Sequence, residues 1–301
     1  MKALLLGNGS RQGVLEQVHR LWPEMEKLIE IVDSDFSGKK DMSNSPADFA
    51  IVFGGDGALL RAVHQLGVNQ IPILAVNLGT LGFLASMPVD KLIDYLKTTR
   101  KEDFSIRNQI LLECSIWRNK KNFPKDFFFN PVLPSLESKE NDQNEICIEK
   151  RLVVNEVAIQ GGPPFEILKI ELLIDDESVT TYHGDGLIIS TPVGSTAHNL
   201  SSGGPILRKD LDVVVISPIS PHTLSYRPVV DSANRSYEIR VVNREVYVVI
   251  DGDSSLTIIP GDRVLIRKWD HYFKMIRVPG RSHYLNLREK LGWSGKIEVS
   301  K

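Results

Sequence analysis

Residues 51–62, IVFGGDGALLRA, place one carboxylate inside a glycine turn. The apolar run before the turn predicts a strand, and the helical spacing of apolar residues after it predicts a helix. Gly54, Gly55 and Gly57 would let backbone N–H groups approach a ligand closely, and a helix N-terminus favours a phosphate. The spacing matches neither a Walker loop nor GxGxxG. Asp56 therefore has two interpretations: it caps the helix, or it takes a proton or holds a cation beside a phosphate.

A second polar stretch lies at 182–201, YHGDGLIISTPVGSTAHNLS. Its Gly-Asp-Gly at 184–186 leads into a predicted strand. A turn follows, in which Ser195 or Thr196 is expected to cap a helix of about two turns that ends at the glycines 203–204. This arrangement again favours an anion at a helix start. The alternative is an ordinary connection between a strand and a helix.

A third stretch, LVVNEVAIQ at 152–160, carries Asn155 and Glu156 inside an apolar run. A buried amide and a buried carboxylate are costly unless they find partners. Because neighbouring strand residues point to opposite faces, both side chains can meet one ligand only at a strand end or a bulge. The alternative is that they hold loop backbone in place. Asp251-Gly252 is typical of a hairpin turn, and we assign no chemistry to it.

The elements around these residues differ between the two halves of the chain. Strand and helix patterns alternate in residues 1–105, which predicts a Rossmann-like α/β domain with a mostly parallel sheet. A helical pattern at 11–22 is expected to end at Pro23. Short β-rich runs in residues 106–301 predict an all-β domain with antiparallel, sandwich-like sheets. Residues 119–150 are predicted to be an inserted loop, and the C-terminal segment is expected to pack back on the first domain.

Composition narrows the functional classes. The 301 residues favour two domains, and the net charge of −2 does not predict a large cationic surface for nucleic acid. Two cysteines give no disulfide framework, and the seven histidines show no zinc-ligand spacing. No apolar run approaches the roughly 20 residues that span a bilayer. We therefore expect a cytoplasmic protein without a nucleic-acid or membrane partner.

Taken together, the motifs resemble the NAD kinase family. Its pattern is a GGDG turn in an α/β domain, then an Asn-Glu pair, a Gly-Asp-Gly and a TPxGSTA stretch in a β-rich domain. These stand here at 54–57, 155–156, 184–186 and 191–197. SSGGPI at 201–206, VISPISPHTLSYRPVV at 215–230 and LREKLGW at 287–293 are also similar to the family. GGDG alone occurs in lipid kinases and phosphofructokinases as well, whereas the four elements in this order are highly specific.

The resemblance implies transfer of the terminal phosphate of ATP to the 2′-hydroxyl of the adenosine ribose of NAD, which gives NADP. It implies Asp56 as general base and Gly54, Gly55 and Gly57 as the phosphate-binding turn. The NAD-binding residues that it implies are Asp56, Gly57, Arg61, Asn155, Glu156, His183, Asp185, Thr196, Ala197, His198, Asn199, Leu200 and Ser201. Mg²⁺ is expected to arrive with ATP rather than on protein ligands. Some members accept polyphosphate, and a homo-oligomer is expected by analogy.

Three positions depart from the usual family pattern. Ala58 stands where threonine is common, His198 where tyrosine is usual, and Asn199 where serine is frequent. Two other interpretations of the chain remain open. One is a lipid kinase of the diacylglycerol type, which shares GGDG, although the Asn-Glu pair and the GSTA stretch argue against it. The other is a non-catalytic NAD-binding sensor, against which the intact Asp56 argues.

Overall fold

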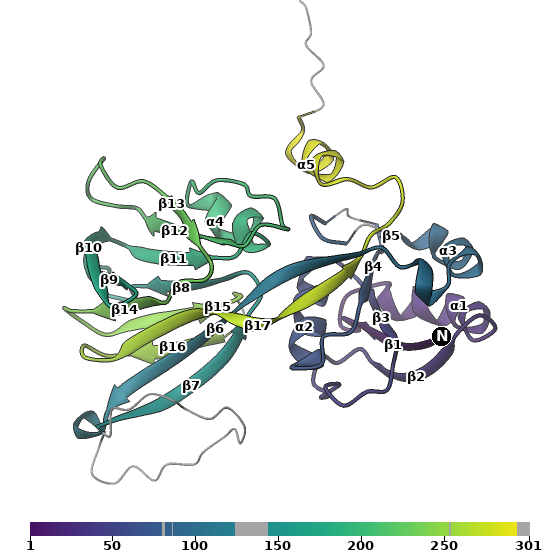
Figure 1. Cartoon of the computed structure of the whole chain (residues 1–301), viewed down its shortest axis with the longest axis horizontal. Helices are drawn as coiled ribbons and strands as arrows, with labels where there is room; N and C mark the ends of the chain where they lie inside the picture. The colour runs from purple at the N-terminus through teal and green to yellow at the C-terminus, as the bar shows by residue number, and fades with distance from the viewer. Residues whose placement is uncertain (80–81, 86, 124–143, 253, 294–301) are drawn as a thin grey trace, which may run out of the picture. The chain divides into compact units, whose positions relative to one another are not determined.

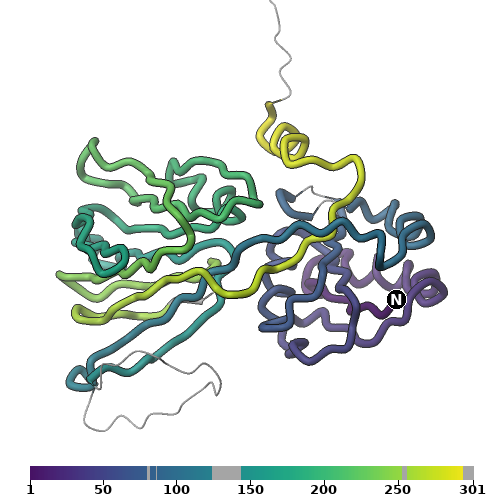
Figure 2. The backbone as a smooth tube through the Cα atoms, in the orientation of Figure 1, coloured from purple at the N-terminus to yellow at the C-terminus, as the bar shows by residue number. Residues whose placement is uncertain are grey.

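The computed structural model describes residues 1–79, 82–85, 87–123, 144–252 and 254–293. These residues form two compact units. Unit 1 contains residues 1–111, the short segment Leu207–Leu211 and the described chain from Asp270 onward. Unit 2 contains residues 112–206 and 212–269. Strands β6 (Ile106–Asn119) and β17 (Arg263–Ile276) contribute residues to both units, and Figures 1 and 2 trace the chain through them.

Unit 1 is built on a parallel sheet, as its sequence pattern predicted. Its strands are β1 (Lys2–Gly7), β2 (Glu30–Asp35), β3 (Phe49–Phe53), β4 (Ile73–Asn77) and β5 (Met87–Pro88). Its helices are α1 (Val14–Met25), α2 (Asp56–Leu66), α3 (Leu92–Thr98) and α5 (His283–Leu291), with 3-10 turns η1 (Val89–Lys91) and η2 (Lys101–Asp103). The strand order is β2-β1-β3-β4, with β5 and the end of β17 beside β4.

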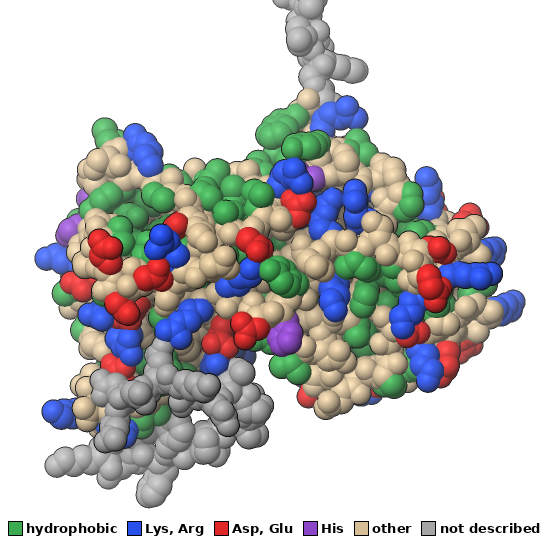
Figure 3. Space-filling view, viewed as in Figure 1, with side chains coloured by type: hydrophobic (Ala, Val, Ile, Leu, Met, Phe, Trp, Pro, Cys, Tyr) green, Lys and Arg blue, Asp and Glu red, His purple; other side chains and the backbone are tan. Residues whose placement is uncertain are grey.

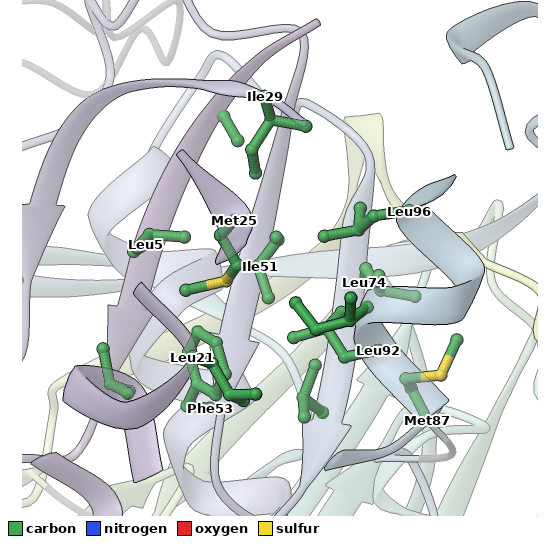
Figure 4. Packing of buried hydrophobic residues seen from close by; sticks show 14 of the residues in the cluster. Leu5, Leu21, Met25, Ile29, Ile51, Phe53, Leu74, Met87, Leu92 and Leu96 are labelled. Atoms are coloured by element: carbon green, nitrogen blue, oxygen red, sulfur yellow. The ribbon is translucent and has the colours of Figure 1, made fainter. Parts of the chain in front are cut away.

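The sheet of unit 1 is covered on both faces, which is why its strands read as continuous apolar runs. Alternate residues such as Leu5, Ile51 and Leu74 pack with α1 and α3 in one buried cluster (Figure 4). The residues between them, such as Leu4 and Val52, are equally buried. Because successive strand residues point to opposite faces, these lie on the other face, where α2 contacts β1 and β3.

Helix α1 extends past the proline that was predicted to end it. Pro23 lies inside α1, and the helix continues to Met25, which is fully buried. A proline in the last turn removes only one helical hydrogen bond, and the backbone N–H of Glu26 still bonds to the carbonyl of Trp22. Burial of Leu21 and Met25 against the sheet therefore outweighs the local preference of proline.

The order of the parallel strands determines where the functional loops lie. The chain leaves β1 toward β2 on one side, while β3 lies on the other side of β1, so the order reverses between β1 and β3. Gly7, Phe53 and Val76, near the ends of β1, β3 and β4, are in register. The loops that follow these strands therefore meet at one sheet edge, which is where open α/β sheets bind ligands.

Unit 2 contains antiparallel sheets, in agreement with the predicted all-β class. One sheet has the order β13-β12-β11-β8-β15-β16, and the other joins β10, β9, β14, β17, β6 and β7. The strands are β7 (Glu145–Val153), β8 (Glu156–Gln160), β9 (Leu168–Ile174), β10 (Glu177–Gly184), β11 (Gly186–Ser190), β12 (Val213–Ile219), β13 (Val229–Ser232), β14 (Tyr237–Val241), β15 (Val246–Ile250) and β16 (Ser254–Ile258). Short helical segments are η3 (Lys120–Asn122), η4 (Gly194–Thr196) and α4 (His198–Ser201).

The structure modifies the expected loop at 119–150. Its two ends are strands, because Asn119 at the end of β6 pairs with Glu145 at the start of β7. Residues 124–143 of this predicted loop lie outside the described residues. Strand β7 was not predicted because its sequence is polar. Its side chains are mostly half-buried rather than fully buried.

The surface carries both signs of charge. Basic and acidic side chains are intermingled over much of the face shown in Figure 3. Every helix in the described part of the chain is too short or too polar to traverse a lipid bilayer.

Candidate active site

Asp56 is the first residue of α2, and its carboxylate faces a second loop rather than its own helix. The helix N-cap is Gly55, and no side chain caps it. Asp56 Oδ2 accepts the backbone N–H of Phe83 at 2.9 Å, and Oδ1 accepts those of Leu84 at 3.0 Å and Ala85 at 3.3 Å. The interpretation of Asp56 as a simple helix cap is therefore wrong, because its oxygens bond to a loop 27–29 residues away.

The loop that holds Asp56 follows β4 and depends on close packing at Gly82. A Cβ built on Gly82 would lie 2.2 Å from Asp56 Oδ1. No function was predicted for this loop from the sequence. The signal available was the pair of glycines, Gly79 and Gly82, just after a buried strand, a position from which a loop reaches the ligand edge of a parallel sheet.

Gly54 and Gly57 occupy different environments in the glycine turn. Gly54 has φ 142°, which side chains rarely adopt, and a Cβ there would lie 2.8 Å from that of Ala58. Ala58 is thus a packing residue of the turn. Gly57 is exposed, and nothing lies within 4 Å of the position of a Cβ, so only a ligand would require a glycine there.

Two arginines lie near this turn. Arg61, predicted from the resemblance, is half-buried on α2, and its Cδ lies 3.1 Å from a Cβ built on Gly38. Arg11, from the loop after β1, places Nη1 3.3 Å from a Cβ built on Gly55. No Lys or Arg lies within the turn's own sequence, so the strand order supplies a cation that its local sequence lacks. Arg11 was not predicted from the sequence, because its position beside the turn depends on the pairing of β1 with β3.

In unit 2, Asn155 and Glu156 lie at the break between β7 and β8, a strand end of the kind that the sequence argument required. The carboxylate of Asp251 holds this break. It accepts the backbone N–H groups of Val154 at 3.0 Å, Asn155 at 2.6 Å and Glu156 at 3.2 Å. Asp251 does lie in a hairpin turn, with φ 52°, but it also positions the Asn-Glu pair, which sequence analysis did not predict.

Glu156 has the electrostatic environment of a functional carboxyl group. Its side chain is 5% exposed, and Oε2 has no hydrogen-bond partner among the described residues. Burial, reinforced by the negative charge of Asp251, raises its pKa from 4.5 to about 8, although a hydrogen bond with the backbone of His198 opposes the shift. The group is therefore protonated at neutral pH and can donate a hydrogen bond.

The Gly-Asp-Gly at 184–186 separates β10 from β11. Asp185 is exposed, and its backbone N–H and C=O bond to Ile219 and Gly161. His183 is half-buried near the end of β10, and its carbonyl accepts the N–H of His222. The backbone of this turn is thus held from both sides, while the carboxylate of Asp185 stays accessible to solvent.

The stretch from Thr191 to Ser201 forms a tight turn followed by a single helical turn, shorter than predicted. Ser195 and Thr196 do not cap α4, whose N-cap is Ala197. Their hydroxyls donate to the carbonyls of Pro192 and Val193. The hydroxyl of Thr191 accepts the N–H of Gly194, the first residue of η4, at 3.1 Å. The predicted NAD-binding residues Thr196, Ala197, His198 and Leu200 are half-buried, and Ser201 is exposed.

Asn199 has an internal role in this stretch. It is fully buried; its Nδ2 donates to the carbonyls of Ser195 and Pro205, and its Oδ1 accepts the hydroxyl of Ser217 at 2.7 Å. These bonds tie the single helical turn to the chain on both sides of it. A contact between the Asn199 side chain and NAD stays a prediction, and the amide has little capacity left for one.

The predicted residues therefore form two groups, one in each unit. Unit 1 brings Asp56 and the glycine turn together with the loop after β4. Unit 2 brings Glu156 together with Asp251 and His198. Among the described residues, no three His, Cys, Asp or Glu side chains gather in a geometry that could hold a metal ion.

Comparison with known proteins identifies the family. The ATP-NAD kinase N-terminal domain matches residues 13–104, and the ATP-NAD kinase C-terminal domain matches residues 154–278. The NAD kinase of Rhodopirellula baltica is 41% identical over 300 residues, which cover 99% of this chain and 88% of that protein. The NAD kinase of Geobacter metallireducens is 33% identical over 281 residues, which cover 90% of each.

Solved structures support the same fold. Yeast NADH kinase complexed with NADH matches with a TM-score of 0.80 at 19% identity, covering 100% of this chain and 90% of the other. An NAD kinase from Archaeoglobus fulgidus in complex with ATP matches with a TM-score of 0.72 at 22% identity, covering 98% and 100%. With the relatives matched along nearly its whole length, the chain belongs to the NAD kinase family.

Proposed function

We propose that this enzyme transfers the terminal phosphate of ATP to the 2′-hydroxyl of the adenosine ribose of NAD, and that Asp56 accepts the proton of that hydroxyl. The observation that carries the role of Asp56 is its set of bonds to the loop after β4. A carboxylate offers about four acceptor positions. Three are taken by the N–H groups of Phe83, Leu84 and Ala85, so one position on Oδ2 is left for a hydroxyl.

The three N–H groups also fix the direction of the carboxylate. A base held in a productive orientation needs no reorganisation when the substrate binds. Removal of a hydroxyl proton by a positioned base typically contributes about 10²–10⁴-fold to the rate. Most of the remaining acceleration in phosphoryl transfer comes from positioning and from neutralising charge on the phosphates. The backbone N–H of Gly57, an exposed residue, would contribute to both.

In unit 2, Glu156 is proposed to hold NAD as a hydrogen-bond donor. Its Oε2 is buried without a partner among the described residues, and its raised pKa keeps the carboxyl protonated at neutral pH. A protonated carboxyl donates to a ribose oxygen or to a ring nitrogen without adding a negative charge beside the phosphates. Asp251 keeps the backbone of Asn155 and Glu156 in place for this contact.

Mg²⁺ is proposed to arrive with ATP. The described residues offer no cluster of three acidic, His or Cys side chains for a metal. Mg²⁺ at nucleotide sites is usually bound by substrate phosphates together with one or two carboxylates. When bound, the ion would neutralise phosphate charge. Polyphosphate as an alternative donor, a cytoplasmic location and a homo-oligomer stay predictions.

The test is an assay of the purified chain with ATP, Mg²⁺ and either NAD or diacylglycerol, for wild type and Asp56→Asn. We expect NADP from the wild type and a turnover reduced about 10²–10⁴-fold in the variant, with NAD binding retained. In Asp56→Asn the side-chain NH₂ group faces the N–H donors of the loop, which disfavours the folded state. Thermal unfolding of both proteins is therefore measured in parallel. Asp90→Asn, an exposed acid of the same unit, is the control.

Each outcome separates the candidate functions. Near-normal NADP formation by Asp56→Asn would refute the base assignment. Phosphorylation of the lipid but not of NAD would favour the lipid kinase. NAD binding without any product from the wild type would favour the sensor.

A further inference from the structure

Unit 1 contains a small pocket whose lining is cationic. Its volume is about 50 Å³, and it lies between the loop after β4, the start of β6, the segment 207–211, the end of β17 and the start of α5. Four of its lining residues are Lys or Arg: Arg107, Lys209, Arg277 and Arg281, of which Arg281 is ion-paired with Glu289; His283 also lines it. No acidic side chain lines it among the described residues. A volume of this size holds roughly three to five waters, or one tetrahedral oxyanion of similar size.

Lys209 is the most unusual of these cations. Its side chain is 6% exposed, and its ammonium group donates a hydrogen bond to the carbonyl of Phe83. No carboxylate of the described residues forms an ion pair with it within 4 Å. An ammonium group has three N–H donors, and a buried charge is costly unless it is paired. Burial, with a smaller effect of the nearby Arg107, lowers the pKa of Lys209 to about 8, although Asp56 opposes the shift.

Two buried amides add unmet hydrogen-bonding capacity to the same pocket. Gln109 is 3% exposed and Asn286 is 8% exposed, and both line the pocket. The Oε1 of Gln109 and the Oδ1 of Asn286 have no hydrogen-bond partner among the described residues. An amide can present either its oxygen or its NH₂ group, so these side chains can meet a P–OH or a P–O⁻. Buried polar groups of this kind are normally satisfied, which indicates a ligand or ordered water.

The pocket is linked to Asp56 through one residue of the loop after β4. The N–H of Phe83 bonds to Asp56, and the C=O of Phe83 accepts from Lys209. From this arrangement we propose that the pocket is a phosphate subsite, in which Lys209 and Arg107 bind a terminal phosphoryl group. The proposal deepens the proposed function, because it names the residues that would neutralise phosphate charge, and it rests on that function only for the identity of the phosphate.

The test measures binding of inorganic phosphate and of tripolyphosphate to the full chain by titration calorimetry. We expect Lys209→Gln to weaken both by roughly ten- to a hundredfold, because a charged hydrogen bond is lost. Arg107→Gln is a second variant, which leaves the bond between Lys209 and Phe83 intact and so tests the subsite if Lys209→Gln does not fold. Lys91→Gln, an exposed lysine of unit 1, is the control and should bind like wild type.

Kinetics and nucleotide binding then distinguish the source of the phosphate. If the subsite takes the donor, Lys209→Gln raises the KM for ATP and leaves that for NAD unchanged. If it takes the product, the variant loses affinity for NADP relative to NAD. Wild type that binds neither phosphate probe, or variants at Lys209 and Arg107 that bind both like wild type, would overturn the subsite. Phosphate binding by an inactive wild type would leave the subsite standing and would refute only the proposed function.

Discussion

Gly82, in the loop after β4, packs directly against the carboxylate of Asp56. A Cβ added at Gly82 would lie 2.2 Å from Asp56 Oδ1, 2.9 Å from its Cγ and 3.2 Å from its Oδ2. Gly82→Ala therefore changes the space around the carboxylate.

The size of the effect follows from these distances. A carbon and an oxygen normally approach to about 3.3 Å, so Oδ1 must move by about 1 Å. Oδ1 carries the hydrogen bonds from Leu84 and Ala85, which such a movement would break or lengthen. A displacement of about 1 Å at a reacting group can cost about 10²-fold in rate, and overpacking costs about 1–3 kcal/mol of stability. We expect Gly82→Ala to show both losses.

The assay combines turnover with a double-mutant cycle. NADP formation from ATP and NAD is measured for Gly82→Ala, and urea unfolding is measured for Gly82→Ala, Asp56→Ala and the double variant. Asp56→Ala removes all three atoms nearest to the added Cβ, so Gly82→Ala should cost little stability in that background. Wild-type turnover in Gly82→Ala, or an equal loss of stability in both backgrounds, would refute the role given to this contact.

Three further predictions concern single side chains. Gly57→Ala should raise the free energy of unfolding by up to about 1 kcal/mol, because the added Cβ has open space on α2. The same variant should raise the KM for ATP, and an unchanged KM would contradict the phosphate-binding assignment. Glu156 has a folded-state pKa above its ordinary value, so it should make wild type lose stability as pH rises from 4.5 to about 8, and urea unfolding of Glu156→Gln should lack this loss. Lys209 has a folded-state pKa below its ordinary value, so wild type should gain stability as pH rises from about 8 to 10.5. Lys209→Met should be more stable than wild type at pH values below about 8. Equal urea unfolding curves of the two proteins at those pH values would contradict the cost of burying this cation.

Much of the fold could be predicted because periodicity reports burial directly. The apolar strands of unit 1, covered on both faces, and the alternation with helices predicted a parallel sheet, and the short β-rich runs predicted antiparallel ones. The secondary-structure predictions were wrong where tertiary packing outweighed the local preference of the sequence. Pro23 lies within α1 because Met25 is buried, and β7 was hidden by its polar side chains.

For the candidate site, the sequence by itself determined the residue types, the glycine turn and the family, because these are properties of contiguous motifs. Only the tertiary structure decided what those residues touch. Asp56 bonds to a loop 27–29 residues away, Asp251 to backbone 95–97 residues away, and Lys209 to a carbonyl 126 residues away. Such partners depend on strand order and register, and a local pattern carries no information about which distant loop a sheet will place beside it.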